Sequence, residues 1–501
     1  MDLSGERGAS PEGVGTAGKP PEEFAEMAPS RNVPPMPFRD MPEPLPLSKM
    51  LGPSVILAGL GVGSGEYILW PFIASNIGLV FMWAAVVGVS LQFFLNMEIE
   101  RYTLATGETA VVGFARFWKP WGILMCIGAI VPNMFPGWAT SGVTIFGYLV
   151  GYGEGAVPYI AIIALIALGI ALTTSPVVYN TMEKAEFFKV GLTFLFLIIA
   201  IFSAISARAV AELVQGVASV GRVPIGVSEF VPISVLLSGL IFAGAGGANN
   251  LVQSNWMRDK GFGMGAYIPR IVSPITGEEV AAPATGSMVR QDETNISRFW
   301  RWWRLANIEQ FTTFWVICVF SILTFSMVAY STVFGKGLAE AADLTFIQAQ
   351  GQELGRIVGG WFGALFWIFG TLSLILVALG ILDYVSRLVA DVLKTLYFRE
   401  NDRWSESRMY FIMVWTLIAI GTIILLAGFD APLILLVTSA CISGFVMAVY
   451  SVLLIQLNRT ALPEAIRVKG WRLGVLVLAA LFYIFFVGWF IVVQIQGLLG
   501  G

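Results

Sequence analysis

Long apolar stretches alternate with short polar connections along most of the chain after residue 50. Eleven of these stretches reach about 20 residues or more, the length that an α-helix needs to cross the hydrocarbon core of a bilayer. They lie near 51–75, 79–100, 121–150, 157–176, 187–206, 231–256, 309–333, 359–384, 410–428, 432–457 and 473–497. The pattern therefore predicts an all-α polytopic membrane protein with eleven transmembrane helices.

The composition also supports a membrane protein and argues against other classes of protein. Of the 501 residues, 56% are hydrophobic and 13% are charged, whereas soluble domains have about 25% charged residues. The net charge of −3 gives no general attraction to nucleic acid. The chain contains no histidine, and no nucleophile–base pair, metal triad or phosphate loop stands out. We therefore expect no enzymatic activity, no nucleic-acid partner and no cofactor.

The polar segments divide the chain and indicate its orientation. Residues 1–46 are rich in Pro, Gly, Glu and Ser, which predicts a disordered tail. Of the 30 Lys and Arg residues, 25 fall on one side if the N-terminus is cytoplasmic, as the positive-inside rule requires. We expect an integral, multi-pass protein of the plasma membrane with a cytoplasmic N-terminus.

Two spans carry glycine clusters with polar side chains at mid-span. Each glycine in a helix interior costs about 0.8–1 kcal/mol relative to alanine, and irregular backbone at membrane depth is tolerated where it is buried or lines a cavity. Both spans are therefore predicted to break there and to form a binding site. The expected site residues are Gly63, Ser64, Gly65 and Glu66 in the first span and Gly244, Gly247, Asn249 and Asn250 in the sixth.

The first and sixth spans are predicted to run in opposite directions, because an odd number of crossings separates their starts. Two inverted repeats of five helices, each opening with a broken helix, would bring the breaks together at the midplane of the bilayer. The repeats would cover 47–206 and 207–457, the second containing a polar cytoplasmic loop at 257–308. Residues 458–501 would add the eleventh helix and the C-terminus.

Short sequence anchors resemble a known family. They are Leu51-Gly-Pro, Leu104-Ala-Thr-Gly-Glu108 and Asn250-Leu251, and they are similar to segments of the natural resistance-associated macrophage proteins (NRAMP), which carry divalent metals. The likeness spans roughly residues 50–460. It implies the 5+5 inverted-repeat fold of the leucine transporter (LeuT fold), with helices one and six broken, and a role in metal transport.

The ligand positions of that family are changed here. Its first break reads Asp-Pro-Gly-Asn; this chain retains the glycine as Gly65 and has Glu66 in place of the asparagine. Its sixth helix reads Met-Pro-His-Asn, where this chain has Gly247-Ala248-Asn249-Asn250. Its acidic pair on helix three aligns approximately with Asn133 and Pro136. The resemblance thus implies an inherited scaffold without the soft metal ligand or the usual proton route.

The remaining donors at the breaks are oxygens. The Glu66 carboxylate and the Asn249 and Asn250 amides suit hard cations such as Mg²⁺ or Mn²⁺. This predicts a secondary transporter that moves a divalent cation by alternating access, with weak or no proton coupling. The alternative is a carrier of the same fold that couples a cation to an amino acid or another small organic solute.

Three further polar residues lie in or next to predicted spans. Asn133 follows Pro132 in the third span and is expected to line the cavity. Asp383 and Arg387 are four residues apart near the end of the eighth span, so they share a helix face and can pair. They form either a structural ion pair or an inner gate. The expected partners are the metal ion and the lipid bilayer, and the sequence carries no signal for an oligomeric state.

Overall fold

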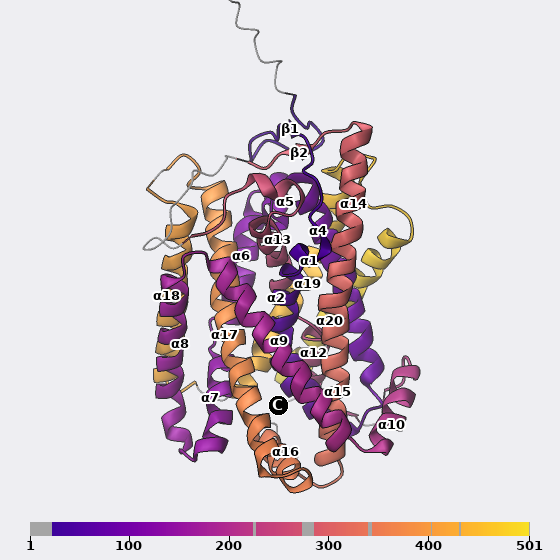
Figure 1. Cartoon of the computed structure of the whole chain (residues 1–501), viewed down its shortest axis with the longest axis vertical. Coiled ribbons are helices and arrows are strands. Elements are labelled where there is room, and N and C mark those ends of the chain that lie inside the picture. Colours follow the sequence, from indigo (N-terminus) through magenta and orange to yellow (C-terminus); the bar gives the residue numbers. More distant parts are fainter. Residues whose placement is uncertain are drawn as a thin grey trace, which may run out of the picture.

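The computed structural model describes residues 23–223, 227–272, 285–338, 343–401, 403–429 and 432–499. Most of these residues are helical, and the long helices run side by side along one axis of the molecule (Figure 1). The elements are β1 (Phe38–Arg39), α1 (Leu47–Met50), α2 (Pro53–Gly61), η1 (Ser64–Leu69), α3 (Trp70–Ile77), α4 (Met82–Thr106), α5 (Ala110–Phe117), α6 (Pro120–Asn133), α7 (Gly137–Val150), η2 (Glu154–Ala156), α8 (Val157–Thr174), α9 (Val178–Ser203), α10 (Ala207–Ala218), α11 (Val227–Phe230), α12 (Ile233–Ile241), α13 (Asn249–Lys260), η3 (Gly263–Tyr267), β2 (Met288–Val289), α14 (Glu293–Gln310), η4 (Phe311–Trp315), α15 (Val316–Thr332), α16 (Thr345–Ile357), α17 (Gly360–Leu396), α18 (Glu406–Leu426), α19 (Pro432–Thr460) and α20 (Trp471–Leu499).

Ten helices within the described ranges are long and apolar enough to cross a membrane. They coincide with ten of the eleven predicted spans. The sixth predicted span is divided into the short helices α12 and α13, neither of which is long enough by itself. The predicted all-α membrane fold is thus confirmed, whereas the count of eleven membrane-spanning helices is not.

The sixth span breaks because three of its glycines adopt backbone angles that other residues avoid. Gly244, Gly246 and Gly247 have φ values of +98°, +72° and +64°. A residue with a Cβ pays roughly 1–2 kcal/mol in this left-handed region. The helix therefore ends at Ile241 and starts again at Asn249, as the glycine cluster predicted.

The first span breaks over a shorter stretch. Helix α2 ends at Gly61, Val62 and Gly63 are irregular, and η1 follows as a π-helical turn that leads directly into α3. π-helical turns are rare in proteins, and those that occur are often found at functional sites. It places Glu66 in the first turn after the break.

The N-terminal tail is only partly as predicted. Residues 23–46 are ordered and lie against one end of the bundle, which we call the N-terminal face (Figure 1). β1 pairs in parallel with β2, and Met36 and Met41 are fully buried. The prediction of disorder is wrong for this stretch, because a few buried apolar side chains and backbone pairs anchor an otherwise polar segment. Residues 1–22 lie outside the described residues.

The predicted polar loop 257–308 also contains more structure than expected. Its last part forms α14, which continues through the π-helical turn η4 into α15. The seventh span therefore begins well before its predicted start at residue 309. Residues 273–284 of this loop lie outside the described residues.

A buried ion pair attaches the N-terminal segment. Glu108 pairs with Arg116 of α5, and Arg116 Nη1 also donates to the carbonyl oxygens of Pro29 at 3.0 Å and Pro34 at 3.1 Å. Burial by itself raises the pKa of the Glu108 carboxyl. The charge of Arg116 and hydrogen bonds from Arg116, Thr285 and Tyr102 outweigh burial, so the pKa of Glu108 lies below its ordinary value.

The first prediction concerns the sixth-span break. Replacing Gly246 by Ala places a Cβ 2.4 Å from the Ile241 carbonyl oxygen at a positive φ, so we expect the melting temperature in detergent to fall. The matched control is Gly191→Ala in α9, where nothing lies within 4 Å of the new Cβ. We expect no destabilisation there, because alanine favours the helix. Equal melting temperatures for the two variants would contradict this account.

The second prediction concerns pH. Because the folded-state pKa of Glu108 is lowered, its stabilising contribution is complete above the unfolded value of about 4.3 and is lost as the pH falls through the folded value. After correction for the intrinsic pH dependence of amide exchange, hydrogen exchange in residues 23–46 should therefore be slow from pH 5 to 8 and faster in acid. Glu108→Gln should speed it at neutral pH, whereas the exposed control Glu26→Gln should not. Unchanged exchange in Glu108→Gln would show that this ion pair does not hold the segment.

Candidate functional site

The two breaks lie against each other in the interior of the bundle. A Cβ on Gly65 would lie 2.0 Å from the carbonyl oxygen of Phe242, so the close approach of the two backbones requires glycine. A Cβ on Gly61 would lie 2.9 Å from Glu66 Oε1 and 3.0 Å from the Gly244 carbonyl oxygen. The Glu66 carboxylate and the Gly244 carbonyl therefore both face Gly61, where the broken helices meet.

Glu66 is fully buried, and neither of its carboxylate oxygens has a hydrogen-bond partner. Its electrostatic neighbours include its own backbone amide and that of Gly63, the thiol of Cys318 on α15 and the side-chain amine of Lys189 on α9. A neutral thiol is a weak hydrogen-bond donor, so it does little to satisfy a carboxylate. Glu66 is thus a buried acid with spare acceptor capacity at the helix break.

Lys189 was not expected here. The sequence pattern predicted that the fifth span begins at residue 187, but α9 begins at Val178. Lys189 and Glu186 are consequently buried, with exposed fractions of 1% and 0%, and they form an ion pair of 2.7 Å. The i, i+3 spacing of the acid and the base was the available signal.

The two asparagines open the second half of the sixth span. Asn249 Nδ2 donates to the carbonyl oxygen of Ala245 at 3.2 Å, and Asn250 Nδ2 donates to Gln92 Oε1 at 3.3 Å. Both Oδ1 atoms are buried without a hydrogen-bond partner. Like the Glu66 carboxylate, these amide oxygens retain their acceptor capacity.

Gln92 of α4 satisfies the irregular backbone of the sixth span. Its Nε2 donates to the Ile241 carbonyl at 2.9 Å, and its Oε1 accepts from the Gly246 amide at 2.9 Å. One side chain thus bridges the last turn of α12 and the glycine loop. Sequence reasoning missed Gln92, because nothing along the chain links it to the break.

Ser373 Oγ donates to the Val62 carbonyl at 2.5 Å, so it gives the backbone of the first break a hydrogen-bond partner.

The other predicted residues at the breaks, which are Gly63, Gly247 and Ser64, occupy structural positions. A Cβ on Gly63 would lie 2.5 Å from Val377, and one on Gly247 would lie 2.8 Å from Ser443. Both glycines therefore allow close packing. Ser64 is 4% exposed and begins η1.

The donor set at the breaks has one carboxylate. Among the described residues, no group of three or more His, Cys, Asp or Glu side chains could hold a metal ion. The available donors are the Glu66 carboxylate, the Asn249 and Asn250 amide oxygens and backbone carbonyls such as that of Gly244. These are hard oxygen donors, the kind that suit Mg²⁺, Mn²⁺ and Ca²⁺.

Asn133 lies at the C-terminal end of α6. Its Nδ2 donates to the Ala129 carbonyl at 2.8 Å. It lines a small cavity of about 30 Å³ together with Trp138 and Ala378. Trp138 in turn faces the ring of Phe242, with the ring centroids 6.1 Å apart, so this cavity borders the sixth-span break.

Asp383 and Arg387 belong to a buried network. Arg387 Nη2 pairs with Asp383 Oδ1 at 2.8 Å, and Arg387 Nη1 pairs with Asp259 of α13. Asp383 also accepts from Trp256 Nε1 at 3.0 Å and from the Tyr410 hydroxyl at 2.8 Å. The network joins α13, α17 and α18, so it ties the second half of the broken sixth span to its neighbours.

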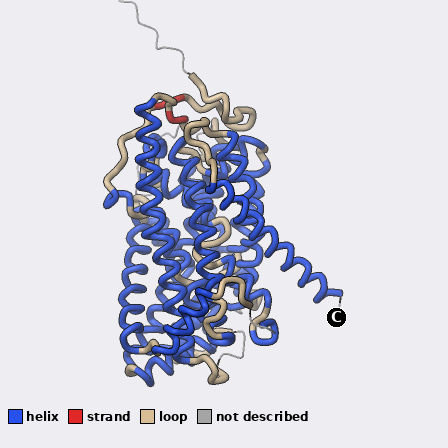
Figure 2. The backbone as a smooth tube through the Cα atoms, turned by 90° about the vertical axis from the view of Figure 1, so that its right-hand side faces the viewer, coloured by secondary structure: helices blue, strands red, loops and turns tan. Residues whose placement is uncertain are grey.

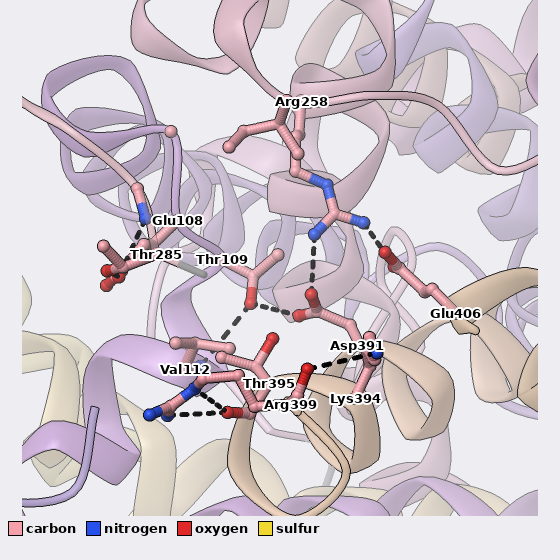
Figure 3. Close-up of a pocket in the computed structure, with 13 residues that line it drawn as sticks. Glu108, Thr109, Val112, Arg258, Thr285, Asp391, Lys394, Thr395, Arg399 and Glu406 are labelled. Atoms are coloured by element: carbon pink, nitrogen blue, oxygen red, sulfur yellow. Dashed lines mark hydrogen bonds and ion pairs between the residues drawn. The ribbon is translucent and has the colours of Figure 1, made fainter. Parts of the chain in front are cut away.

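A second set of ion pairs lies in a crevice at the N-terminal face. Arg258 of α13 bridges Asp391 of α17 and Glu406 of α18, each at 2.6 Å (Figure 3). Thr109 Oγ1 adds a 2.6 Å hydrogen bond to Asp391. The cavity between these groups has a volume of about 130 Å³. Together with Arg387, Arg258 fixes α13 to the long helix α17 at two levels.

A third prediction tests the role of Gln92. Gln92→Leu leaves the Ile241 carbonyl and the Gly246 amide without partners, at a cost of about 1–3 kcal/mol for each buried group. We expect amide exchange in residues 242–248 to speed up by at least tenfold, measured by hydrogen–deuterium exchange. Gln215→Leu on the exposed surface of α10 is the control. Equal exchange in both variants would contradict the assigned role.

Comparisons with known proteins establish the fold. No protein-family model matches the sequence, and no curated protein is similar to it in sequence. The manganese transporter of Eremococcus coleocola is similar in structure, with a TM-score of 0.64 and 13% identity over 92% of this chain and 91% of that one. Its complex with an aromatic bis-isothiourea substituted compound gives 0.59 and 13% over 91% and 88%. MhsT in complex with L-phenylalanine gives 0.50 and 14% over 87% and 98%. The predicted LeuT-type fold is confirmed.

Proposed function

We propose that the protein is a secondary transporter that moves a divalent metal cation across the membrane by alternating access. The observation that carries this proposal is the set of unpartnered oxygens at the helix breaks. The Glu66 carboxylate and the Oδ1 atoms of Asn249 and Asn250 are buried and accept no hydrogen bond. A buried charge without a partner is costly, and a bound cation would relieve that cost.

The chemistry of the donors favours a hard cation. Carboxylate, amide and backbone carbonyl oxygens suit Mg²⁺ or Mn²⁺ better than Zn²⁺ or Cu²⁺, which prefer nitrogen and sulfur. The last carbonyls of α2 and α12 also point toward the breaks, and helix C-termini attract positive charge. The structural similarity to a manganese transporter supports this cargo. The cation is the substrate and not a resident cofactor.

The ion pairs at the N-terminal face support an inner gate. Arg258 and Arg387 link α13 to α17 through Asp391 and Asp259, so these ion pairs would have to break for the two helices to separate. We propose that this face is cytoplasmic, that the membrane is the plasma membrane, and that Asp383 and Arg387 form part of the closed inner gate. The excess of Lys and Arg on this side supports the orientation.

We propose weak or no proton coupling. A proton route needs titratable groups, and Asn133 and Pro136 stand where the resemblance would place an acidic pair. Lys189 forms an ion pair with Glu186 and interacts electrostatically with Glu66.

The same lysine favours the second candidate, a cation-coupled carrier of an amino acid or similar solute. If Lys189 balances Glu66, the site needs no metal to offset the carboxylate. The N-terminus of α13 would then be available for an anionic group of the solute. MhsT, a structurally similar protein, has been solved in complex with L-phenylalanine.

The fourth prediction distinguishes these candidates by titration calorimetry on purified protein. Mn²⁺ or Mg²⁺ should give saturable heat without any organic solute. Glu66→Gln keeps the size of the side chain but removes its charge, so we expect at least a tenfold loss of affinity, equivalent to about 1.4 kcal/mol. Glu154→Gln, on the exposed turn η2, should bind as the wild type does.

Two outcomes would contradict the metal proposal. One is the absence of metal binding at millimolar concentration. The other is saturable binding of an L-amino acid in metal-free buffer, which would support the second candidate. Uptake into proteoliposomes with and without a pH gradient then tests the proposed weakness of proton coupling.

A further inference from the structure

An apolar groove lies on the side of the bundle between α12, α19 and α20. It has a volume of about 390 Å³ and is lined mainly by apolar side chains, among them Val235, Val437, Phe445 and Phe490. This volume falls within the range of about 300–1,000 Å³ typical of small-molecule sites. The groove is separate from the helix breaks and from the charged crevice at the N-terminal face.

Few polar side chains line the groove, namely those of Ser234, Thr438 and Cys441. Cys441 Sγ lies 3.6 Å from the hydroxyl of Ser238, which donates to the carbonyl oxygens of Ser234 at 2.6 Å and of Val437 at 3.2 Å. None of the lining side chains is charged, so van der Waals contact with apolar side chains is the main attraction available to a ligand.

The groove opens toward the hydrocarbon of the bilayer. Two of its walls, α19 and α20, are membrane-spanning helices by length and composition. Helix α20 leaves the bundle at an angle toward its C-terminal end (Figure 2), and Leu481 and Phe485 are 60% and 64% exposed. Phe490, toward the C-terminal end of α20, lines the groove.

We propose that this groove binds one acyl chain of a bilayer lipid. A chain of methylene groups matches both the apolar walls and the hydrocarbon into which the groove opens. Lipid tails in the bilayer are already surrounded by hydrocarbon, so the gain on binding comes from van der Waals contacts with the walls of the groove and not from removal of apolar surface from water. Acyl chains are also the molecules that surround α19 and α20 when these helices span a bilayer.

The position of the groove connects it to the sixth-span break. Val235 lies in α12, whose last turn carries the Ile241 carbonyl that Gln92 holds. The side chain of Ile241 packs beside Gly444 of α19. A lipid chain between α12 and α19 therefore supports the half-helix that leads into the break, and its loss would loosen residues 242–248.

The first test is photo-crosslinking in nanodiscs of phosphatidylcholine that include a diazirine-bearing acyl chain. We expect labelling of residues 437–445 and of the region around Phe490 at least fivefold above that of α18 around Ile423, which is 66% exposed. Val437→Phe fills the groove and should reduce this labelling to the level of α18. The matched control, Ile423→Phe, should leave it unchanged.

Cys441 provides a second measurement that needs no variant. It is partly exposed in the groove, whereas Cys126 and Cys318 are buried. Alkylation of Cys441 by N-ethylmaleimide in detergent should slow at least fivefold when phosphatidylcholine is added.

A third measurement tests the effect on the sixth-span break. Removal of lipid should speed amide exchange in residues 242–248 of the wild type, and the filled groove of Val437→Phe should suppress that effect.

Three results would overturn the proposal. They are uniform labelling of all lipid-facing helices, an alkylation rate of Cys441 that does not respond to lipid, and oxidative formation of a Cys441–Cys441 dimer in the bilayer. The last result would show that a second copy of the chain covers the groove. If labelling is as expected but the rate of amide exchange does not change with lipid, the groove binds lipid without stabilising α12. That result would contradict the proposed effect on the sixth-span break.

Discussion

The architecture depends on one constraint: backbone amides and carbonyls inside a membrane need hydrogen-bond partners. An unbroken helix supplies those partners by itself, but two spans of this protein are interrupted. Side chains from other helices supply what the breaks lose. Gln92 bridges the Ile241 carbonyl and the Gly246 amide, and Ser373 donates to the Val62 carbonyl. The breaks are thus held open by their surroundings, and the glycines make their close contact possible.

Some buried charges have close partners of opposite sign. Arg258 and Arg387 each bridge two acids, an arrangement in which the loss of one partner is costly. Both carboxylate oxygens of Glu66, in contrast, are buried without a hydrogen-bond partner where the two breaks meet. The proposed position of the cargo rests on this spare acceptor capacity.

Much of the fold could be predicted because its signals are local. Runs of apolar residues predicted ten of the spans. The glycine cluster from Gly244 to Gly247 predicted the sixth-span break, where these glycines adopt positive φ values. The ordered segment 23–46 could not be predicted, since its polar composition hides anchors such as Met36 and Met41. Its stability comes from contacts with residues distant in the sequence.

The candidate site was predicted in part for the same reason. Glu66 and the Asn249–Asn250 pair stood out as polar residues inside apolar spans. Gln92 and Lys189 did not, because their importance comes from which helix faces the breaks. Lys189 lies near the start of the predicted fifth span, and no local signal showed that it lies near Glu66. Tertiary contacts of this kind leave little trace in a single sequence.

The most direct test of the metal site is the position of a bound ion. Crystals grown with Mn²⁺ can be measured by anomalous diffraction, which locates manganese independently of the protein density. The account predicts a peak between the Glu66 carboxylate and the amide oxygens of Asn249 and Asn250. A manganese peak confined to other positions, or no peak at a Mn²⁺ concentration that saturates calorimetric binding, would contradict it.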